Sequence, residues 1–99
     1  MTDDADDGDP LAEPLVLPIT GELDLHTFAP QDVPSVVTEY LAACRERGIL
    51  QVRVVHGRGK GVQRAVVRRL LATLPEVETF EDAPPVSGGW GATIVWLRV

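Results

Sequence analysis

Two histidines and a cationic glycine turn give this sequence its clearest capacity for acid–base and phosphate chemistry. His56 ends an apolar run and is followed by residues 57–61, in which Arg58 and Lys60 alternate with three glycines. Glycine allows the backbone to adopt positive φ and to approach a ligand closely. A helix that begins directly after such a turn also presents unpaired N–H groups and the positive end of its dipole to an anion. The pattern therefore indicates a phosphate site.

The second histidine, His26, follows Asp24 by two residues, a spacing that places both side chains on one face of a strand. A carboxylate in that position can orient an imidazole and hold its proton. We predict that Asp24 and His26 form an acid–base pair and that His56 transfers a second proton or contacts the phosphate. For either histidine taken singly, the alternative is a polar cap at the end of a strand.

The candidate phosphate ligands continue from the turn into the segment that follows it. Five bases and no acid occur between residues 58 and 69. Arginines four residues apart share one face of a helix, although a basic run of this kind also suits a merely solvated face. The turn has neither the P-loop spacing nor the dinucleotide fingerprint. The candidate ligands are Gly57, Arg58, Gly59, Lys60, Gly61, Arg64 and Arg68.

Two further features bear on ligands and cofactors. Trp90 lies among the glycines of residues 88–91 and has two candidate roles, stacking on a nucleobase or closing the end of the sheet. The acid–base residues could in principle ligate a metal, but there is no cysteine cluster and no histidine-rich spacing, so no structural zinc is expected. No cofactor is required by the pattern, and Mg²⁺ is the one candidate to test in phosphodiester chemistry.

Hydrophobic periodicity predicts the elements that must position these residues. Strands are expected at residues 22–26, 49–55, 77–80 and 92–97, with a long loop at 81–91. One helix is expected to follow an N-cap at Asp32 and to end at Gly48. A second is expected to open at Gly59 or Gly61 and to stop at Pro75. The predicted inner face of the first helix is Val33, Val36, Val37, Tyr40, Leu41 and Cys44, and that of the second is Val62, Val66, Leu70 and Leu74.

The order β-α-β-α-β-β predicts an α/β fold, a two-layer α/β sandwich. A helical crossover between the first two main strands makes them parallel, so both histidines fall at the carboxyl edge of the sheet. Ligands of open α/β sheets bind at that edge. We therefore expect both imidazoles and the cationic turn to line a common pocket.

Length and charge divide the chain into an acidic tail and one small domain. Residues 1–14 are expected to be a disordered acidic tail, because they offer almost nothing to bury, and residues 15–99 are expected to fold. The net charge of the whole chain is −6, yet residues 25–99 hold nine bases and seven acids. Charges beyond a Debye length of about 8 Å are largely screened, so a polyanion meets the local basic patch.

Features that are absent from the sequence indicate the cellular compartment of the protein. Cys44 is the only cysteine, so no internal disulfide can form. No apolar run is long enough to span a membrane, and the acidic start does not resemble a signal peptide. We expect a cytoplasmic protein that does not associate with membranes.

Three motifs, in order, resemble those of the Smr (small MutS-related) domain family. They are Leu23-Asp24-Leu25-His26, then residues 55–61 around His56, then residues 88–97 preceded by Ala83-Pro84-Pro85, and the resemblance covers residues 22–97. It implies a fold similar to the C-terminal domain of bacterial translation initiation factor three. It also implies nucleic-acid binding, with nicking endonuclease activity on DNA or RNA in several members.

The resemblance maps the family's acid and histidine onto Asp24 and His26, and its His-Gly-x-Gly turn onto His56, Gly57 and Gly59. The chain departs from many members at Thr27, where they have glycine. It also departs at residues 31–34, Gln-Asp-Val-Pro, where they have a Glu-Ala pair.

We therefore predict a nucleic-acid-binding domain that is a candidate nicking endonuclease, cleaving DNA or RNA by histidine–aspartate acid–base chemistry. Two alternatives stay open. One is a non-catalytic module that binds nucleic acid or associates with the ribosome. The other is a protein-interaction domain whose acidic tail meets a basic protein partner.

Overall fold

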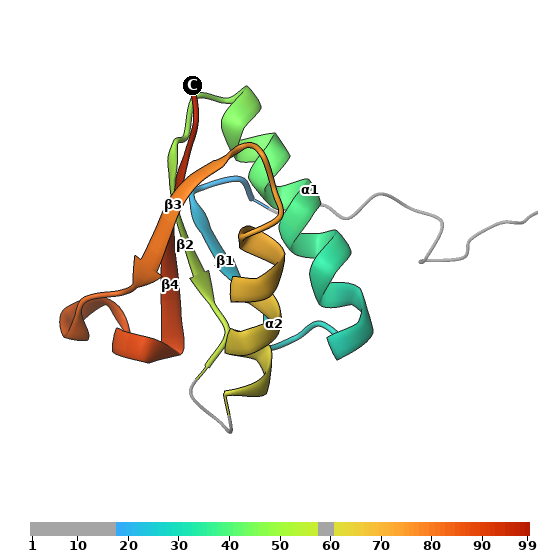
Figure 1. The fold of residues 1–99 in the computed structure, drawn as a ribbon, viewed down its shortest axis with the longest axis vertical. Helices are drawn as coiled ribbons and strands as arrows, with labels where there is room; N and C mark the ends of the chain where they lie inside the picture. The colour runs from blue at the N-terminus through green and yellow to red at the C-terminus, as the bar shows by residue number, and fades with distance from the viewer. Residues whose placement is uncertain (1–17, 58–60) are drawn as a thin grey trace, which may run out of the picture.

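The computed structural model describes residues 18–57 and 61–99, which form a four-stranded sheet with two α-helices on one face (Figure 1). The strands are β1 (Glu22–Asp24), β2 (Gln51–Val55), β3 (Val77–Asp82) and β4 (Ala92–Leu97), in the spatial order β1-β2-β4-β3. β1 and β2 are parallel, and β4 runs antiparallel to both of its neighbours. The predicted two-layer α/β class and the parallel pairing are confirmed. The predicted acidic tail, residues 1–14, and Arg58, Gly59 and Lys60 of the turn lie outside the described residues.

Strand ends differ from the expected ones where strand pairing overrides local pattern. β1 ends at Asp24 instead of residue 26, although the N–H of Leu25 still donates to the carbonyl of Val55 at 2.9 Å. β3 continues to Asp82, two residues beyond the predicted end at Phe80. It does so because β4 lies beside it and pairs with it as far as Asp82. This longer strand brings an additional carboxylate to the sheet edge.

α1 (Val33–Glu46) buries the predicted apolar stripe against the sheet. Asp32 is the N-cap residue, but its side chain makes no capping hydrogen bond. Pro34 lies in the first turn, where its missing N–H costs no intrahelical bond. Gly48 follows the helix with a φ of +75°. This φ belongs to the left-handed conformation, which glycine adopts without penalty.

Tyr40, from this stripe, also ties the chain that enters β1. Its hydroxyl accepts the N–H groups of Thr20 and Gly21, each at 3.2 Å, and donates to the carbonyl of Glu22 at 2.9 Å. A buried hydroxyl needs such partners. The start of β1 is therefore held against α1 by one side chain.

α2 (Val62–Leu71) opens at Gly61, one of the two predicted positions, and its predicted inner face is correct in part. Val66, Leu70 and Leu74 are partly buried and pack against the core, whereas Val62 is 66% exposed. Val67 and Leu71, which the predicted face omits, are fully buried. Four residues turn an α-helix by more than one full revolution, so a strict four-residue series drifts around the helix and cannot follow one buried face along its length. The helix also ends at Leu71, before Pro75.

A small second cluster lies on the open face of the sheet, opposite the helices. Ala83, Ala92 and Ile94 pack there with partly buried Trp96. The segment that contains the 3-10 turns Pro85–Ser87 and Gly89–Gly91 lies on this side of the sheet (Figure 1). In the described part of the chain, no helix has the length and apolar character needed to span a membrane.

Candidate functional site

The carboxyl ends of β1 and β2 lie side by side, as the sequence predicted. Asp24 pairs in register with Val55, and the chain then continues to His26 on one strand and to His56 on the other. The end of β2 and the start of α2 are at the same end of the molecule (Figure 1). This sheet edge, which we call the carboxyl edge, holds most of the described candidate residues.

The Asp24–His26 pair is solvent-exposed. Their side chains are 57% and 79% exposed, and Nδ1 of His26 lies 3.7 Å from Oδ1 of Asp24. The same oxygen accepts the backbone N–H of His26 at 3.0 Å. The firm contact of the carboxylate is thus to the backbone, and the ring lies slightly beyond hydrogen-bond length. Asp24 places the imidazole at the surface and leaves it accessible to a ligand.

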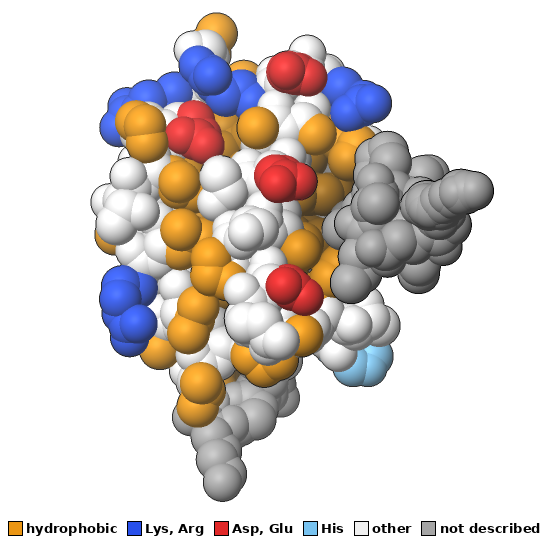
Figure 2. Space-filling view, turned by 90° about the vertical axis from the view of Figure 1, so that its right-hand side faces the viewer, with side chains coloured by type: hydrophobic (Ala, Val, Ile, Leu, Met, Phe, Trp, Pro, Cys, Tyr) orange, Lys and Arg blue, Asp and Glu red, His pale blue; other side chains and the backbone are white. Residues whose placement is uncertain are grey.

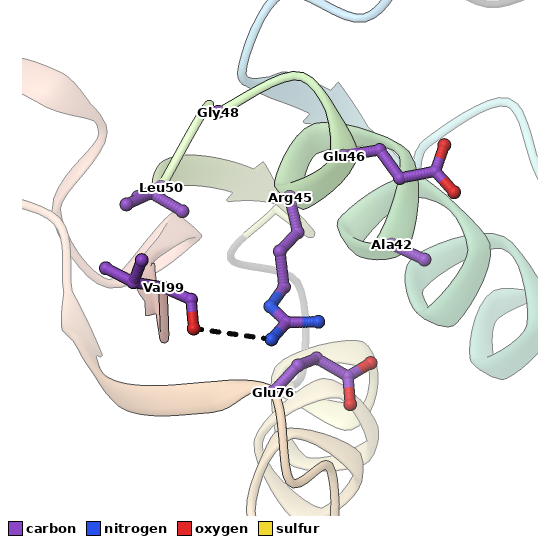
Figure 3. A pocket seen from close by; sticks show the side chains of 7 residues that line it. All are labelled: Ala42, Arg45, Glu46, Gly48, Leu50, Glu76 and Val99. Carbon is purple, nitrogen blue, oxygen red and sulfur yellow. Dashed lines mark hydrogen bonds between the residues drawn. The ribbon is translucent and has the colours of Figure 1, made fainter.

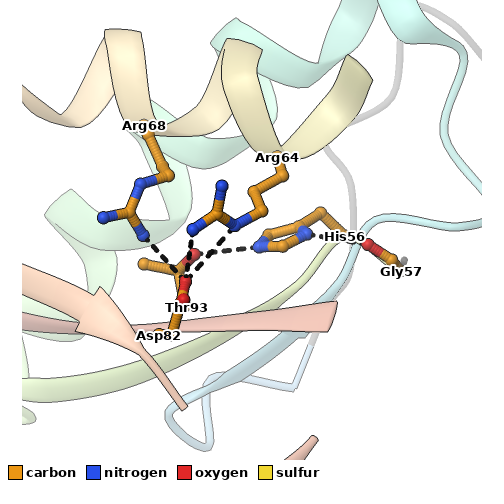
Figure 4. A network of polar contacts seen from close by, with 6 residues as sticks. All are labelled: His56, Gly57, Arg64, Arg68, Asp82 and Thr93. Atoms are coloured by element: carbon orange, nitrogen blue, oxygen red, sulfur yellow. Dashed lines mark hydrogen bonds and ion pairs between the residues drawn. The ribbon is translucent and has the colours of Figure 1, made fainter. Parts of the chain in front are cut away.

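His56 has the opposite environment. It is only 7% exposed, and both ring nitrogens are engaged: Nδ1 lies 3.0 Å from the carbonyl of Gly57 and Nε2 lies 2.8 Å from Oγ1 of Thr93 (Figure 4). A carbonyl only accepts, so Nδ1 carries a proton; in the neutral ring Nε2 then accepts the threonine hydroxyl. This arrangement ties the ring to the first residue of the glycine turn.

The surroundings of His56 favour its neutral form. Burial, the largest influence, lowers the pKa of the imidazole below its ordinary 6.5, and the positive charges of Arg64 and Arg68 act in the same direction. The carbonyl of Gly57 and the charge of Asp82 oppose them. A histidine that stays neutral with both nitrogens occupied is poorly placed for proton exchange with a ligand.

The two histidines follow neighbouring strands at the same edge of the sheet, but the residues around them lie on opposite faces of it. Asp24, between two buried leucines, points to the open face of the sheet, whereas His56 reaches Thr93, which pairs with buried Val54 on the helix side. A cavity of about 400 Å³ beside Asp24 is lined by residues that include Phe28 and Tyr40, and by neither histidine. The expected common pocket for both imidazoles therefore does not follow from the described geometry.

Arg64 and Arg68 are together but already paired, which the sequence did not suggest. Oδ1 of Asp82 accepts from Nη2 and Nε of Arg64 at 2.8 and 3.3 Å and from Nη1 of Arg68 at 3.1 Å (Figure 4). The guanidinium of Arg68 also lies 5.1 Å from the ring centre of Phe80, within cation–π range. The pairing lowers the pKa of the Asp82 carboxyl, mainly through its hydrogen bond to Arg64.

Sequence reasoning missed both Asp82 and Thr93. Asp82 fell outside the predicted strand, and Thr93 looked like an ordinary strand residue. The only signal that could have found them is the antiparallel register, in which Asp82 lies opposite Thr93 and Thr93 lies opposite Val54.

The glycine-rich segment around Trp90 is tied to the same corner. The carbonyl of Gly91 accepts the N–H groups of His56 and Gly57 at 3.1 and 2.8 Å. Arg53 anchors the preceding turn, donating from Nε to the carbonyl of Ser87 at 2.7 Å. Trp90 is 45% exposed beside this junction, so part of its ring is available for contact.

The other surfaces are less suited to a phosphate. On the helix side, acidic and basic side chains are interspersed among apolar ones, with cations gathered along the upper rim (Figure 2). A cavity of about 470 Å³ at the opposite end of the sheet contains Glu46 and Glu76 (Figure 3). Its Arg45 already donates to the carbonyl of Arg98 at 3.0 Å. Among the described residues, no group of three or more His, Cys, Asp or Glu could hold a metal ion.

Known proteins resemble this chain in both fold and sequence. The family model described as "Smr domain" matches residues 23–98. The crystal structure of the Smr domain of Thermus thermophilus MutS2 superposes with a TM-score of 0.77 at 36% identity, covering 81% of this chain and all of that domain. YdaL, a stand-alone small MutS-related protein from Escherichia coli, gives a TM-score of 0.75 at 26% identity, covering 80% of this chain and 65% of YdaL.

Relatives of greater length match over the same region. Endonuclease MutS2 of Thermus thermophilus is 38% identical over 77 residues, which is 78% of this chain but 10% of MutS2. Ribosome rescue factor SmrB of Tolumonas auensis is 36% identical over 76 residues, 77% of this chain and 44% of SmrB. The chain thus spans less than half the length of these relatives. The family model covers most of the chain and the solved domains share its fold, so the chain belongs to the Smr domain family.

Proposed function

We propose that this domain binds the phosphate backbone of a nucleic acid with the carboxyl edge of its sheet, and that it cleaves phosphodiester bonds there. The observation that carries the proposal is the position of an exposed Asp24–His26 pair at the same edge as Gly57, Gly61 and the arginines of α2. The names of two relatives, an endonuclease and a ribosome rescue factor, are consistent with a nucleic-acid ligand.

His26 is the proposed proton-transfer group because its ring is exposed and Asp24 lies beside it. The imidazole takes a proton from the attacking water or hydroxyl as its oxygen bonds to phosphorus. The bond from phosphorus to the leaving oxygen then breaks, and the imidazolium returns the proton to that oxygen. A positioned group of this kind typically contributes about 10²–10⁴-fold to the rate.

His56 has a different proposed role. Its bonds to Gly57 and Thr93 fix the backbone where β2 ends, so it acts as a positioning residue for the phosphate site. A site that is held rigid in this way needs little reorganisation when charge develops in the transition state. This assignment replaces a second proton-transfer role, because neither ring nitrogen is free of a protein partner.

Binding and cleavage are tested side by side on single-stranded, duplex and branched DNA and on structured RNA, with and without Mg²⁺. We expect His26→Ala to bind as the wild type does and to cleave about 10²–10⁴-fold more slowly. Thr27→Ala, an exposed neighbour, is the matched control for the loop. Wild-type protein that binds but cuts no substrate refutes the cleavage proposal, and absence of binding at low salt refutes both.

A further inference from the structure

In the described part of the carboxyl edge, Arg64 and Arg68 both bind one carboxylate, that of Asp82. Three hydrogen bonds converge on Oδ1 of Asp82, two from Arg64 at 2.8 and 3.3 Å and one from Arg68 at 3.1 Å. Two guanidinium groups around one anionic oxygen is also the arrangement that binds a phosphate.

The cluster remains accessible to solvent. The side chains of Arg64, Arg68 and Asp82 are 31%, 30% and 42% exposed. Exposed ion pairs contribute little net stability, so the arginines can exchange one anion for another at small cost. One carboxylate also leaves an excess of positive charge, because it faces two guanidinium groups.

The position of the cluster connects it to the turn. Asp82 pairs in register with Thr93, whose hydroxyl bonds Nε2 of His56, and His56 in turn bonds the carbonyl of Gly57 (Figure 4). The two arginines lie one helical turn apart on α2, which begins directly after Gly61. A phosphate held by Arg64 and Arg68 would therefore lie near His56 and the first turns of α2.

We infer that Arg64 and Arg68 form a phosphate subsite and that Asp82 is its internal competitor, a carboxylate that a backbone phosphate displaces on binding. Asp82 thereby lowers the affinity of the two arginines for any anion. It also favours highly charged ligands over weakly charged ones, because only a highly charged ligand can displace the carboxylate. The identity of the biological ligand rests on the proposed function, whereas the competition itself does not.

Asp82→Asn tests the inference because it removes the competing charge and keeps the side-chain shape. We expect affinity for a fluorescein-labelled oligothymidylate and for inorganic pyrophosphate to rise about two- to fivefold for each arginine released. Glu78→Gln, the same charge change on an exposed residue at the other end of β3, is the matched control.

The outcomes separate this inference from the proposed function. Tighter pyrophosphate binding by Asp82→Asn, in a protein that binds no oligonucleotide, supports the competition and refutes the proposed function. Affinity no higher than that of Glu78→Gln overturns the competition, and weaker binding does so too, because Asp82 would then be needed to hold the arginines in place.

Two further variants control for misfolding of Asp82→Asn and for effects that do not involve the arginines. Asp82→Ser supplies another neutral side chain if the asparagine variant does not fold, as judged by circular dichroism. Adding Arg64→Gln to Asp82→Asn should remove most of the gain in pyrophosphate affinity. A gain that persists in the double variant arises elsewhere and overturns the inference.

Discussion

Thr93→Val tests the internal contact on which the carboxyl edge depends. Thr93 is fully buried, and its hydroxyl lies 2.8 Å from Nε2 of His56. Valine has nearly the same shape but cannot donate a hydrogen bond, so the substitution leaves a buried ring nitrogen without a partner. Such a loss costs about 1–3 kcal/mol. The added methyl recovers at most about 0.8 kcal/mol through burial.

With the full recovery, the expected net loss is about 0.2–2.2 kcal/mol in the free energy of unfolding, with a centre of about 1 kcal/mol. For a folded region of this size, that corresponds to a decrease in Tm of about 4–8 °C per kcal/mol. Urea denaturation at pH 7.5, followed by circular dichroism, measures it. Thr79→Val makes the same chemical change at an exposed position of β3 and should stay within about 0.5 kcal/mol of the wild type.

The comparison has a clear refuting result. If Thr93→Val and Thr79→Val have the same unfolding free energy, the hydrogen bond to His56 contributes nothing to the fold. The positioning role proposed for His56 is then refuted, because the short hydrogen bond between His56 and Thr93 would not stabilise the fold. Thr93→Ser, which keeps the hydroxyl, should preserve the titration of His56 followed by NMR even though it loses a methyl group.

The remaining predictions concern pH and backbone conformation. Because burial lowers the pKa of folded His56 below 6.5, the unfolded chain binds the extra proton first. The contribution of His56 to stability is thus fully present above about pH 7.5 and is lost as the pH falls below 6.5 toward the folded pKa. The urea midpoint of His56→Gln should lack this pH-dependent decrease. If the midpoints of the variant and the wild type change with pH in the same way, the prediction is contradicted. Gly88→Ala should destabilise the fold by about 2–3 kcal/mol, more than Gly48→Ala at about 1 kcal/mol. Both glycines have positive φ, +114° and +75°, but only at Gly88 would a Cβ meet close neighbours, 3.2 Å from Nη2 of Arg53 and 3.3 Å from Cβ of Ala92; equal losses in urea denaturation would show that these contacts relax freely.

The sequence by itself determined the order of the elements and the gathering of residues at one sheet edge. The apolar stripe of α1 and the strand at residues 92–97 follow from local periodicity, which depends only on backbone geometry. The parallel pairing of β1 and β2 follows from the helical crossover between them. Asp24, His26 and His56 therefore reach the carboxyl edge on grounds that the chain carries locally.

Only the tertiary structure decided which of these residues touch. β4 lies between β2 and β3, and its register places Thr93 beside both His56 and Asp82, residues far from one another along the chain. No local pattern encodes such a register, because it results from the packing of all four strands against the helices. This register buries His56 and pairs the arginines of α2 with a carboxylate, whereas His26 follows the edge strand β1 and stays exposed. The two histidines therefore differ in their chemical roles because their long-range neighbours differ.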